Sequence, residues 1–198
     1  MDKYGAGQDA YCYPGTSVLR NKLGIEDDEQ LSRAERDLSE IGASQIDFDL
    51  PPYDLAYLKR IHLTLFQDVY DWAGEIRRVD ISKAATRFCN VNRVEAEALK
   101  IFTNLQHADW YEGCTRDKLI KLVAECFGDL NMIHPFREGN GRAQRILFEH
   151  LIVNAGFEIN WWNVNEQEWI SANIDAVVCD YSSLQHIFER CIGAAIND

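Results

Sequence analysis

The chain has 198 residues and a mass of 22.8 kDa, and 46% of its residues are hydrophobic, which fits one compact domain with a substantial core. Its 20 Lys and Arg stand against 32 Asp and Glu, so the net charge is −12, and a surface of that sign repels nucleic acid. No apolar run approaches the roughly 20 residues that cross a bilayer, and the first residues lack a signal-peptide pattern. We therefore expect a cytoplasmic protein that contacts neither nucleic acid nor membrane directly.

The six cysteines are scattered, with no C-x-x-C pair and no histidine at zinc-finger spacing. Cys126 and Cys191 fall at apolar positions of predicted helices. We expect reduced, structural thiols rather than a disulfide framework or a cysteine-bound metal.

Apolar residues recur at helical spacing in seven segments, which begin near residues 27, 54, 92, 115, 141, 166 and 183. The first runs to about residue 42, and its predicted buried face consists of Leu31, Ala34, Leu38 and Ile41. The second is capped by Asp54 and extends to Gly74. The third opens with a capping box from Asn92 to Glu95, and the fifth ends at Gly156.

One stretch alternates as strands do, with residues 79–82 and 88–91 flanking a turn at 83–87. An isolated hairpin is marginally stable, so this one must lean on the helices. The expected fold is mainly α, a helical bundle with a single β-hairpin. We expect one domain over residues 1–198, with a core at about 54–156 and helical additions at both ends.

The most informative segment, residues 134–145, reads HPFREGNGRAQR and lies between two apolar helices. Pro135 should end the preceding helix at His134. Gly139 and Gly141 allow a tight turn, and the N–H groups at the start of the next helix then form an anion site. Arg142 and Arg145 are three residues apart, so both can reach one polyphosphate.

Two further residues of this segment suit phosphate chemistry. Glu138 is its only acid, and a hard carboxylate beside phosphates suits Mg²⁺. His134 can be neutral at cellular pH and accept a proton from a hydroxyl. Each feature alone has an ordinary structural explanation, but together they indicate nucleotide phosphate chemistry.

Basic residues are concentrated in two stretches of this acidic chain. Residues 75–93 hold five basic residues against two acids, and residues 134–145 hold three against one. Such concentrations favour an anion site, and the alternative is a set of ordinary salt-bridged surface residues.

The run from His134 to Arg145 resembles the signature of Fic domains, H-P-F-x-[DE]-G-N-G-R-x-x-R, with every defined position filled. The helical core, the upstream hairpin and the Asp71-Trp72-Ala73-Gly74 segment extend the resemblance over most of the chain. It is similar in particular to toxin-type Fic proteins, whose inhibitor is a separate small antitoxin.

The resemblance implies a protein adenylyltransferase that moves AMP from ATP to a hydroxyl side chain of a target protein. It implies His134 as the general base and Glu138 as the Mg²⁺ ligand. The loop 139–141, with the Asn140 side chain, would bind the α- and β-phosphates. Arg142 would contact the β-phosphate and Arg145 the γ-phosphate. Phe136 would pack inward and hold the loop.

In the family the hairpin acts as a flap that pairs with the target backbone by strand addition. Here the resemblance places it at about residues 79–91, with Ile81, Ser82 and Lys83 as target-binding residues. A hairpin that merely covers the core is the alternative. Resemblance to toxin-type members implies a type II topoisomerase ATPase subunit as a target candidate.

Many Fic proteins are inhibited by a helix with a Ser/Thr-x-x-x-Glu pattern, whose Glu pairs with the second Arg of the motif. No Ser or Thr in this sequence is followed by Glu four residues later. We therefore expect restraint by an antitoxin that places a Glu against Arg145.

Two other interpretations stay open. The first is a Fic-fold transferase of phosphate or another nucleotide, although Asn140 and Gly141 favour the AMP-transfer pattern. The second is a non-catalytic Fic-like interaction module, which an intact motif disfavours. A metallohydrolase is disfavoured because the sequence has no H-E-x-x-H motif.

Overall fold

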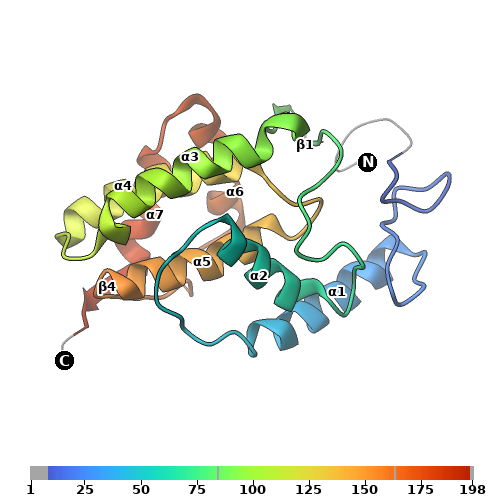
Figure 1. The fold of residues 1–198 in the computed structure, drawn as a ribbon, viewed down its shortest axis with the longest axis horizontal. Coiled ribbons are helices and arrows are strands. Elements are labelled where there is room, and N and C mark those ends of the chain that lie inside the picture. Colours follow the sequence, from blue (N-terminus) through green and yellow to red (C-terminus); the bar gives the residue numbers. More distant parts are fainter. Residues whose placement is uncertain (1–8, 84, 163, 197–198) are drawn as a thin grey trace.

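The computed structural model describes residues 9–83, 85–162 and 164–196, and these ranges are mainly helical (Figure 1). The seven α-helices within them are α1 (Asp28–Ala43), α2 (Leu55–Phe66), α3 (Val94–His107), α4 (Arg116–Ile133), α5 (Asn140–Asn154), α6 (Glu166–Asp175) and α7 (Ser182–Cys191). Short 3₁₀ helices occupy Val91–Arg93, Asp109–Tyr111 and Ala176–Val178. The predicted fold class is confirmed. None of the helices in the described ranges has the length and apolar character that crossing a bilayer requires.

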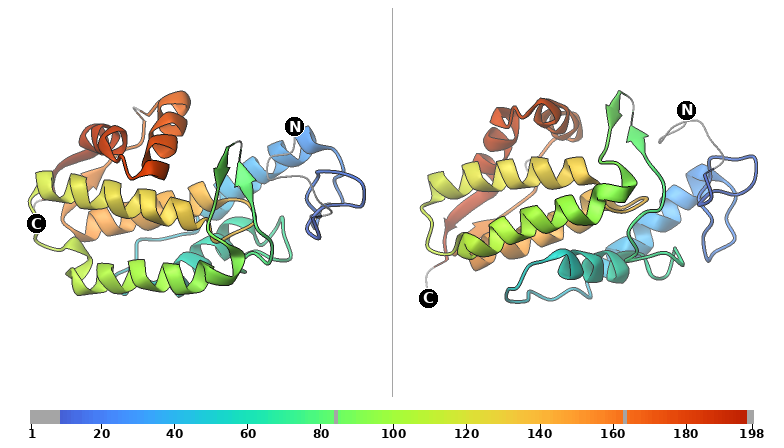
Figure 2. Two further views of the ribbon diagram at one scale, coloured as in Figure 1. Left: turned by 90° about the horizontal axis from the view of Figure 1, so that it is seen from above. Right: turned by 45° about the horizontal axis from the view of Figure 1, so that its top comes forward.

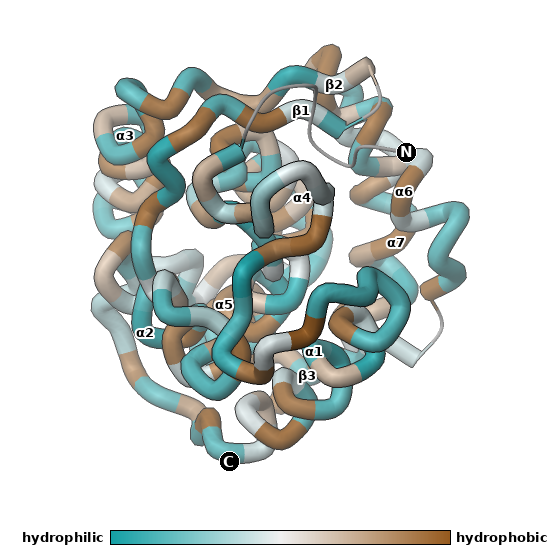
Figure 3. The backbone as a smooth tube through the Cα atoms, turned by 90° about the vertical axis from the view of Figure 1, so that its right-hand side faces the viewer, coloured by the Kyte–Doolittle hydropathy of each residue, from teal (hydrophilic) through white to brown (hydrophobic). Residues whose placement is uncertain are grey.

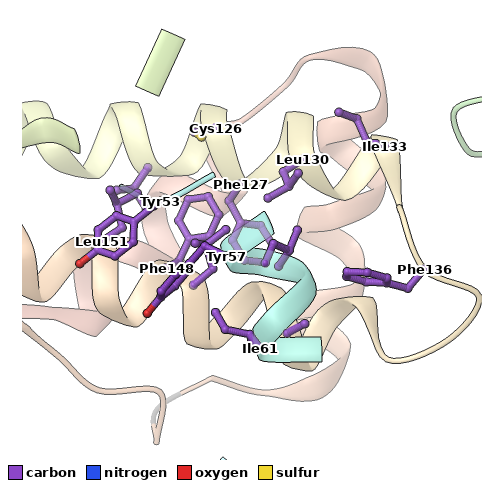
Figure 4. Close-up of a cluster of buried hydrophobic side chains, with 14 of the residues drawn as sticks. Tyr53, Tyr57, Ile61, Cys126, Phe127, Leu130, Ile133, Phe136, Phe148 and Leu151 are labelled. Atoms are coloured by element: carbon purple, nitrogen blue, oxygen red, sulfur yellow. The ribbon is translucent and has the colours of Figure 1, made fainter. Parts of the chain in front are cut away.

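The centre of the molecule is an aromatic and aliphatic cluster between α2, α4 and α5 (Figure 4). The rings of Phe127 on α4 and Phe148 on α5 meet edge-to-face at 4.9 Å, and Phe188 of α7 lies 5.7 Å from Phe127. Such edge-to-face pairs add stability beyond the burial of their area. Cys126 and Cys191 are buried as predicted, and all six cysteines are free thiols.

The second helix starts where the sequence predicts and ends earlier. The Asp54 side chain caps α2 by accepting a hydrogen bond from the Tyr57 N–H at 2.7 Å. The predicted end at Gly74 is wrong, because α2 stops at Phe66. The Phe66 carbonyl then accepts the N–H groups of both Val69 and Tyr70, so the chain continues in tight turns.

The predicted capping box of the third helix is also wrong. Residues Val91–Arg93 form a 3₁₀ turn, and Asn90 caps it by accepting the Asn92 N–H at 3.1 Å. The α-helix therefore begins later, at Val94, and no side chain caps it.

The buried face of α1 differs from the predicted one. Ile41 is 55% exposed, whereas Glu35, Ser39 and Gly42 are buried together with Leu31. Glu35 and Ser39 bind the Arg142 guanidinium, and a polar face of the helix therefore turns inward. Apolar periodicity does not detect a helix face that is buried through ion pairing.

The predicted hairpin is present, with strands β1 (Ser82–Lys83) and β2 (Thr86–Arg87) paired antiparallel. It projects from the helices beside the end of α4 (Figure 2). Of the paired residues, Lys83, Thr86 and Arg87 lie inside the predicted turn and only Ser82 lies in an expected strand, so the strand bounds 79–82 and 88–91 are largely wrong. The reason is that side chains bind the backbone of the outer segments. Arg77 donates a hydrogen bond to the Val79 carbonyl, and the Asp80 carboxylate accepts one from the Val91 N–H.

A second two-stranded sheet was not predicted. Strand β3 (Phe157–Ile159) pairs antiparallel with β4 (Ile192–Ala195). It ties the end of α5 to the end of α7. Three or four residues are too few for an alternating pattern to be recognised.

Candidate nucleotide and hydroxyl site

His134 follows the last residue of α4 and has a left-handed backbone, with φ of 48°. Its Nδ1 lies 3.1 Å from the Asn131 carbonyl oxygen, which can only accept a hydrogen bond. Nδ1 therefore carries the hydrogen, and the Nε2 lone pair is available to take a proton. The imidazole stacks on the Phe88 ring with a centroid distance of 3.9 Å, which places the hairpin against it.

The surroundings of His134 keep its imidazole neutral. Burial lowers its pKa to about 4. The Asn131 carbonyl and the Glu138 carboxylate act in the opposite direction, whereas the positive charges of Arg77 and Lys83 add to the lowering. At neutral pH the side chain is a base in its unprotonated form.

The loop from His134 to Gly139 is closed by Asn140. The Asn140 Oδ1 accepts the Phe136 N–H at 2.8 Å, and Nδ2 donates to the Phe136 carbonyl at 2.9 Å. Asn140 is buried, so its side chain fixes the loop and does not face an open anion site as the resemblance implies. Phe136 points from the loop toward the core, as expected (Figure 4).

His62 on α2 contacts the same loop and is a site residue that was not predicted from the sequence. Its Nδ1 accepts the Gly74 N–H at 2.8 Å, and Nε2 donates to the Glu138 carbonyl at 2.9 Å. Its ring stacks on Phe136 at 3.8 Å. Burial lowers the pKa of His62 to about 4, so it is a neutral structural histidine. Its place on the apolar side of α2, beside Ile61, is the only signal in the sequence.

Gly139 and Gly141 are glycines for different physical reasons. At Gly139, φ is +77° and a Cβ would lie 2.3 Å from the Phe66 ring, so the fold itself requires glycine. At Gly141, the second helical residue of α5, a Cβ would meet no protein atom within 4 Å. Gly141 is exposed and leaves open space in front of the first N–H groups of α5.

Glu138 lies at this helix start, where negative charge is favoured. Its Oε1 accepts the Gly139 N–H at 3.1 Å, and the side chain is partly exposed. Within the described ranges no group of three or more His, Cys, Asp or Glu residues is arranged to hold a metal ion. A single carboxylate together with phosphate oxygens is a donor set that Mg²⁺ accepts, so the residues fit a metal that binds with a nucleotide.

The two motif arginines lie in different environments. The Arg142 guanidinium turns to α1, where it pairs with Glu35, donates to the Ser39 hydroxyl at 2.9 Å and stacks over Phe66. Tyr70 also donates to Glu35. The charge of Arg142 is therefore compensated by the protein, which differs from the expected phosphate contact.

Arg145 is held by aromatic faces instead. Its guanidinium carbon lies 5.1 Å from the ring centroid of Trp169 and 5.8 Å from that of Trp161. The Trp161 indole donates to Glu149 at 2.6 Å, and Glu149 reaches no ion-pair distance to Arg145 among the described residues. Burial lowers the pKa of Arg145, and the nearby Glu149 carboxylate acts in the opposite direction. The charge of Arg145 is thus compensated less directly than that of Arg142.

Most basic residues of the stretch 75–93 form surface salt bridges, which is the alternative to an anion site. Arg78, Arg87 and Arg93 pair with Glu75, Asp80 and Glu97, respectively. Arg77 is buried. The exposed Lys83 remains, close enough to His134 to affect its pKa.

The three expected flap residues lie together beside His134. Ile81 is 2% exposed and anchors the hairpin, so its side chain is not available to a target. Ser82 and Lys83 form β1, whose outer edge faces no other strand in the described part of the chain. A free strand edge suits backbone pairing with an extended segment. Figure 3 looks onto this end of the bundle, where the hairpin and α5 lie.

We predict that His62 makes the fold acid-sensitive. Its folded pKa of about 4 lies below the ordinary 6.5, so between these values the unfolded chain binds the extra proton and stability falls as the pH drops. In His62→Gln, the loss of unfolding free energy between about pH 7 and about pH 5, measured by urea denaturation, should be smaller than in the wild type. The exposed His186→Gln is the control. An unchanged pH dependence in His62→Gln would contradict the assignment.

The comparisons with known proteins identify the family of the chain. The model of the Fic/DOC family matches residues 52–152. A probable protein adenylyltransferase Fic of Salmonella typhimurium is 37% identical over 194 residues, which cover 98% of this chain and 97% of that protein. The crystal structure of BepC from Bartonella tribocorum with bound AMPPNP has a TM-score of 0.88 at 25% identity, covering 94% of this chain and 97% of that one. The N-terminal Fic domain of a VirB-translocated Bep effector protein from Bartonella quintana with bound ADP has a TM-score of 0.89 at 26% identity, covering 94% of this chain and 95% of that one. With a family match over half of its length and relatives of this similarity, the chain belongs to the Fic/DOC family.

Proposed function

We propose that this protein transfers AMP from ATP to a hydroxyl side chain of another protein. The observation that carries the proposal is the neutral His134 imidazole, with Nε2 available, at the edge of an open helix N-terminus. The names of the relatives and the nucleotides bound in the similar structures support it.

In the proposed reaction a target hydroxyl attacks the α-phosphorus of ATP, the bond to the bridging oxygen breaks, and pyrophosphate leaves. His134 Nε2 accepts the hydroxyl proton. The first N–H groups of α5 stabilise the charge on the phosphate oxygens, and Arg145 contacts the γ-phosphate. The hairpin holds the target segment, so the reacting groups start close together.

Glu138 would hold Mg²⁺ together with the α- and β-phosphates, and the ion would neutralise their charge. The side chain is partly exposed beside the N–H of Gly139, which supports this role. Because Arg142 is already paired with Glu35, its proposed β-phosphate contact requires that it share or exchange this partner.

We further propose that the protein is the toxin of a toxin–antitoxin pair and acts in the cytoplasm. The antitoxin would place a Glu against Arg145 and so compete with the γ-phosphate. The support is that the Arg145 guanidinium lies against two tryptophan rings and is not held in a close ion pair as Arg142 is. A type II topoisomerase ATPase subunit is the target candidate.

The experiment that tests the proposed reaction compares ATP labelled at the α- or γ-phosphate in a bacterial lysate. We expect only the α-label on protein, and His134→Ala should reduce transfer by about 10²–10⁴-fold while ATP still binds. His186→Ala, on an exposed site, is the matched control and should transfer normally. The γ-label on protein would mean phosphotransfer, and no label would mean a binding module. Full AMP transfer by His134→Ala would refute the assignment of His134 as the general base.

The open space at Gly141 gives a second prediction. Gly141→Ala should bind Mg·ATP more weakly, because the methyl group enters the space in front of the helix N–H groups. Its stability should not fall, since alanine favours a helix over glycine by up to about 1 kcal/mol. Calorimetric titration and thermal unfolding measure the two effects. Gly139→Ala is the contrast and should lose stability. If Gly141→Ala binds ATP with wild-type affinity, the phosphates do not bind in front of the α5 N–H groups.

The γ-phosphate role of Arg145 gives a third prediction. Arg145→Ala should weaken ATP binding by about 10–100-fold, the range for a hydrogen bond to a charged group, and should affect AMP little. Arg33→Ala, an exposed change on α1, is the control. If ATP and AMP lose affinity equally, Arg145 does not contact the γ-phosphate.

A further inference from the structure

Arg77 is the largest side chain buried in the loop that leads to the hairpin. It lies outside the motif and is 1% exposed. Asp80, the carboxylate that pairs with it, is 3.9 Å from Nη1. The guanidinium is therefore surrounded mainly by backbone carbonyls, and burial lowers its pKa.

On one side Arg77 binds the end of α4. Its Nε donates to the His134 carbonyl at 2.8 Å, and Nη2 donates to the Ile133 carbonyl at 3.2 Å. Its own backbone N–H donates to the Pro135 carbonyl at 2.9 Å. These three consecutive carbonyls lie at the negative end of the α4 dipole, where the helix offers them no donor.

On the other side Arg77 binds both stems of the hairpin. Nη1 donates to the Val79 carbonyl at 2.6 Å, and Nη2 also donates to the Cys89 carbonyl. The Cys89 N–H in turn donates to the Met132 carbonyl at 3.0 Å. Phe88, one residue earlier, stacks on the His134 ring.

A lysine could not make these contacts. The planar guanidinium directs its donors in several fixed directions, whereas an ammonium offers three donors from one point. The five N–H groups of the guanidinium suit a junction of three chain segments.

We propose that Arg77 is a positioning residue, which holds the His134 imidazole and the hairpin in one fixed arrangement so that a hydroxyl presented by the hairpin meets the base. The role rests on the proposed function. Nucleotide binding should not depend on it, because none of the hydrogen bonds of Arg77 reaches residues 139–145.

The test compares Arg77→Met and Arg77→Lys with the matched control Arg78→Met, an exposed neighbour paired with Glu75. Three quantities are measured: Mg·ATP affinity, α-label transfer to lysate protein, and the pH titration of the His134 ring by NMR. In Arg77→Met we expect unchanged ATP affinity and transfer reduced by about 10²-fold, the cost of misplaced reactants. Arg77→Lys should be intermediate, and Arg78→Met should match the wild type.

The NMR titration distinguishes positioning from general support of the fold. The charged groups that act on His134 are Glu138, Arg77 and Lys83, with the Asn131 carbonyl on Nδ1. Removing the Arg77 charge and admitting water should raise the His134 pKa from about 4 toward its ordinary value. This readout needs no transfer activity, so it tests Arg77 even if the proposed reaction is wrong.

Two outcomes would overturn the proposal. One is a folded Arg77→Met protein with wild-type titration and transfer. The other is a parallel loss of ATP affinity and transfer, which indicates only a damaged fold. If Arg77→Met does not fold, Arg77→Lys decides by the same two criteria.

Discussion

The site depends on one loop, between α4 and α5, whose shape is fixed by hydrogen bonds within the protein. Asn140 closes it through both hydrogen bonds to Phe136, and His62 supports it from α2. The closed loop fixes the direction of His134 at one end and the start of α5 at the other. In the proposed reaction, a base and an anion site that the fold itself fixes lose little entropy when the substrate binds.

The two arginines of the motif, Arg142 and Arg145, lie in different electrostatic environments. Arg142 is neutralised by Glu35 of α1 and becomes part of the packing between α1 and α5. Arg145 is oriented by Trp161 and Trp169, whose faces attract the cation without cancelling its net charge. Of the two motif arginines, Arg145 is therefore the one whose charge is compensated less directly by the protein.

The sequence could predict the helical class, the helix starts and the residues of the motif, because these follow from spacing and local chemistry. It could not predict which motif residues face a ligand. Asn140 is indistinguishable in sequence from a phosphate-binding side chain, and its bonds to Phe136 appear only when the loop is folded. The burial of Arg77 and Glu35 could not be predicted, because each depends on a partner far away in the sequence, the end of α4 for Arg77 and Arg142 for Glu35.

The central claim is that the loop is already built for a triphosphate. The most direct measurement is a crystal structure with Mg²⁺ and a non-hydrolysable ATP analogue. We expect the Asn140–Phe136 bonds to persist, the phosphates to lie over Gly141 at the start of α5, and Nε2 of His134 to face the α-phosphorus. A rearranged loop, or a nucleotide bound away from α5, would contradict the account.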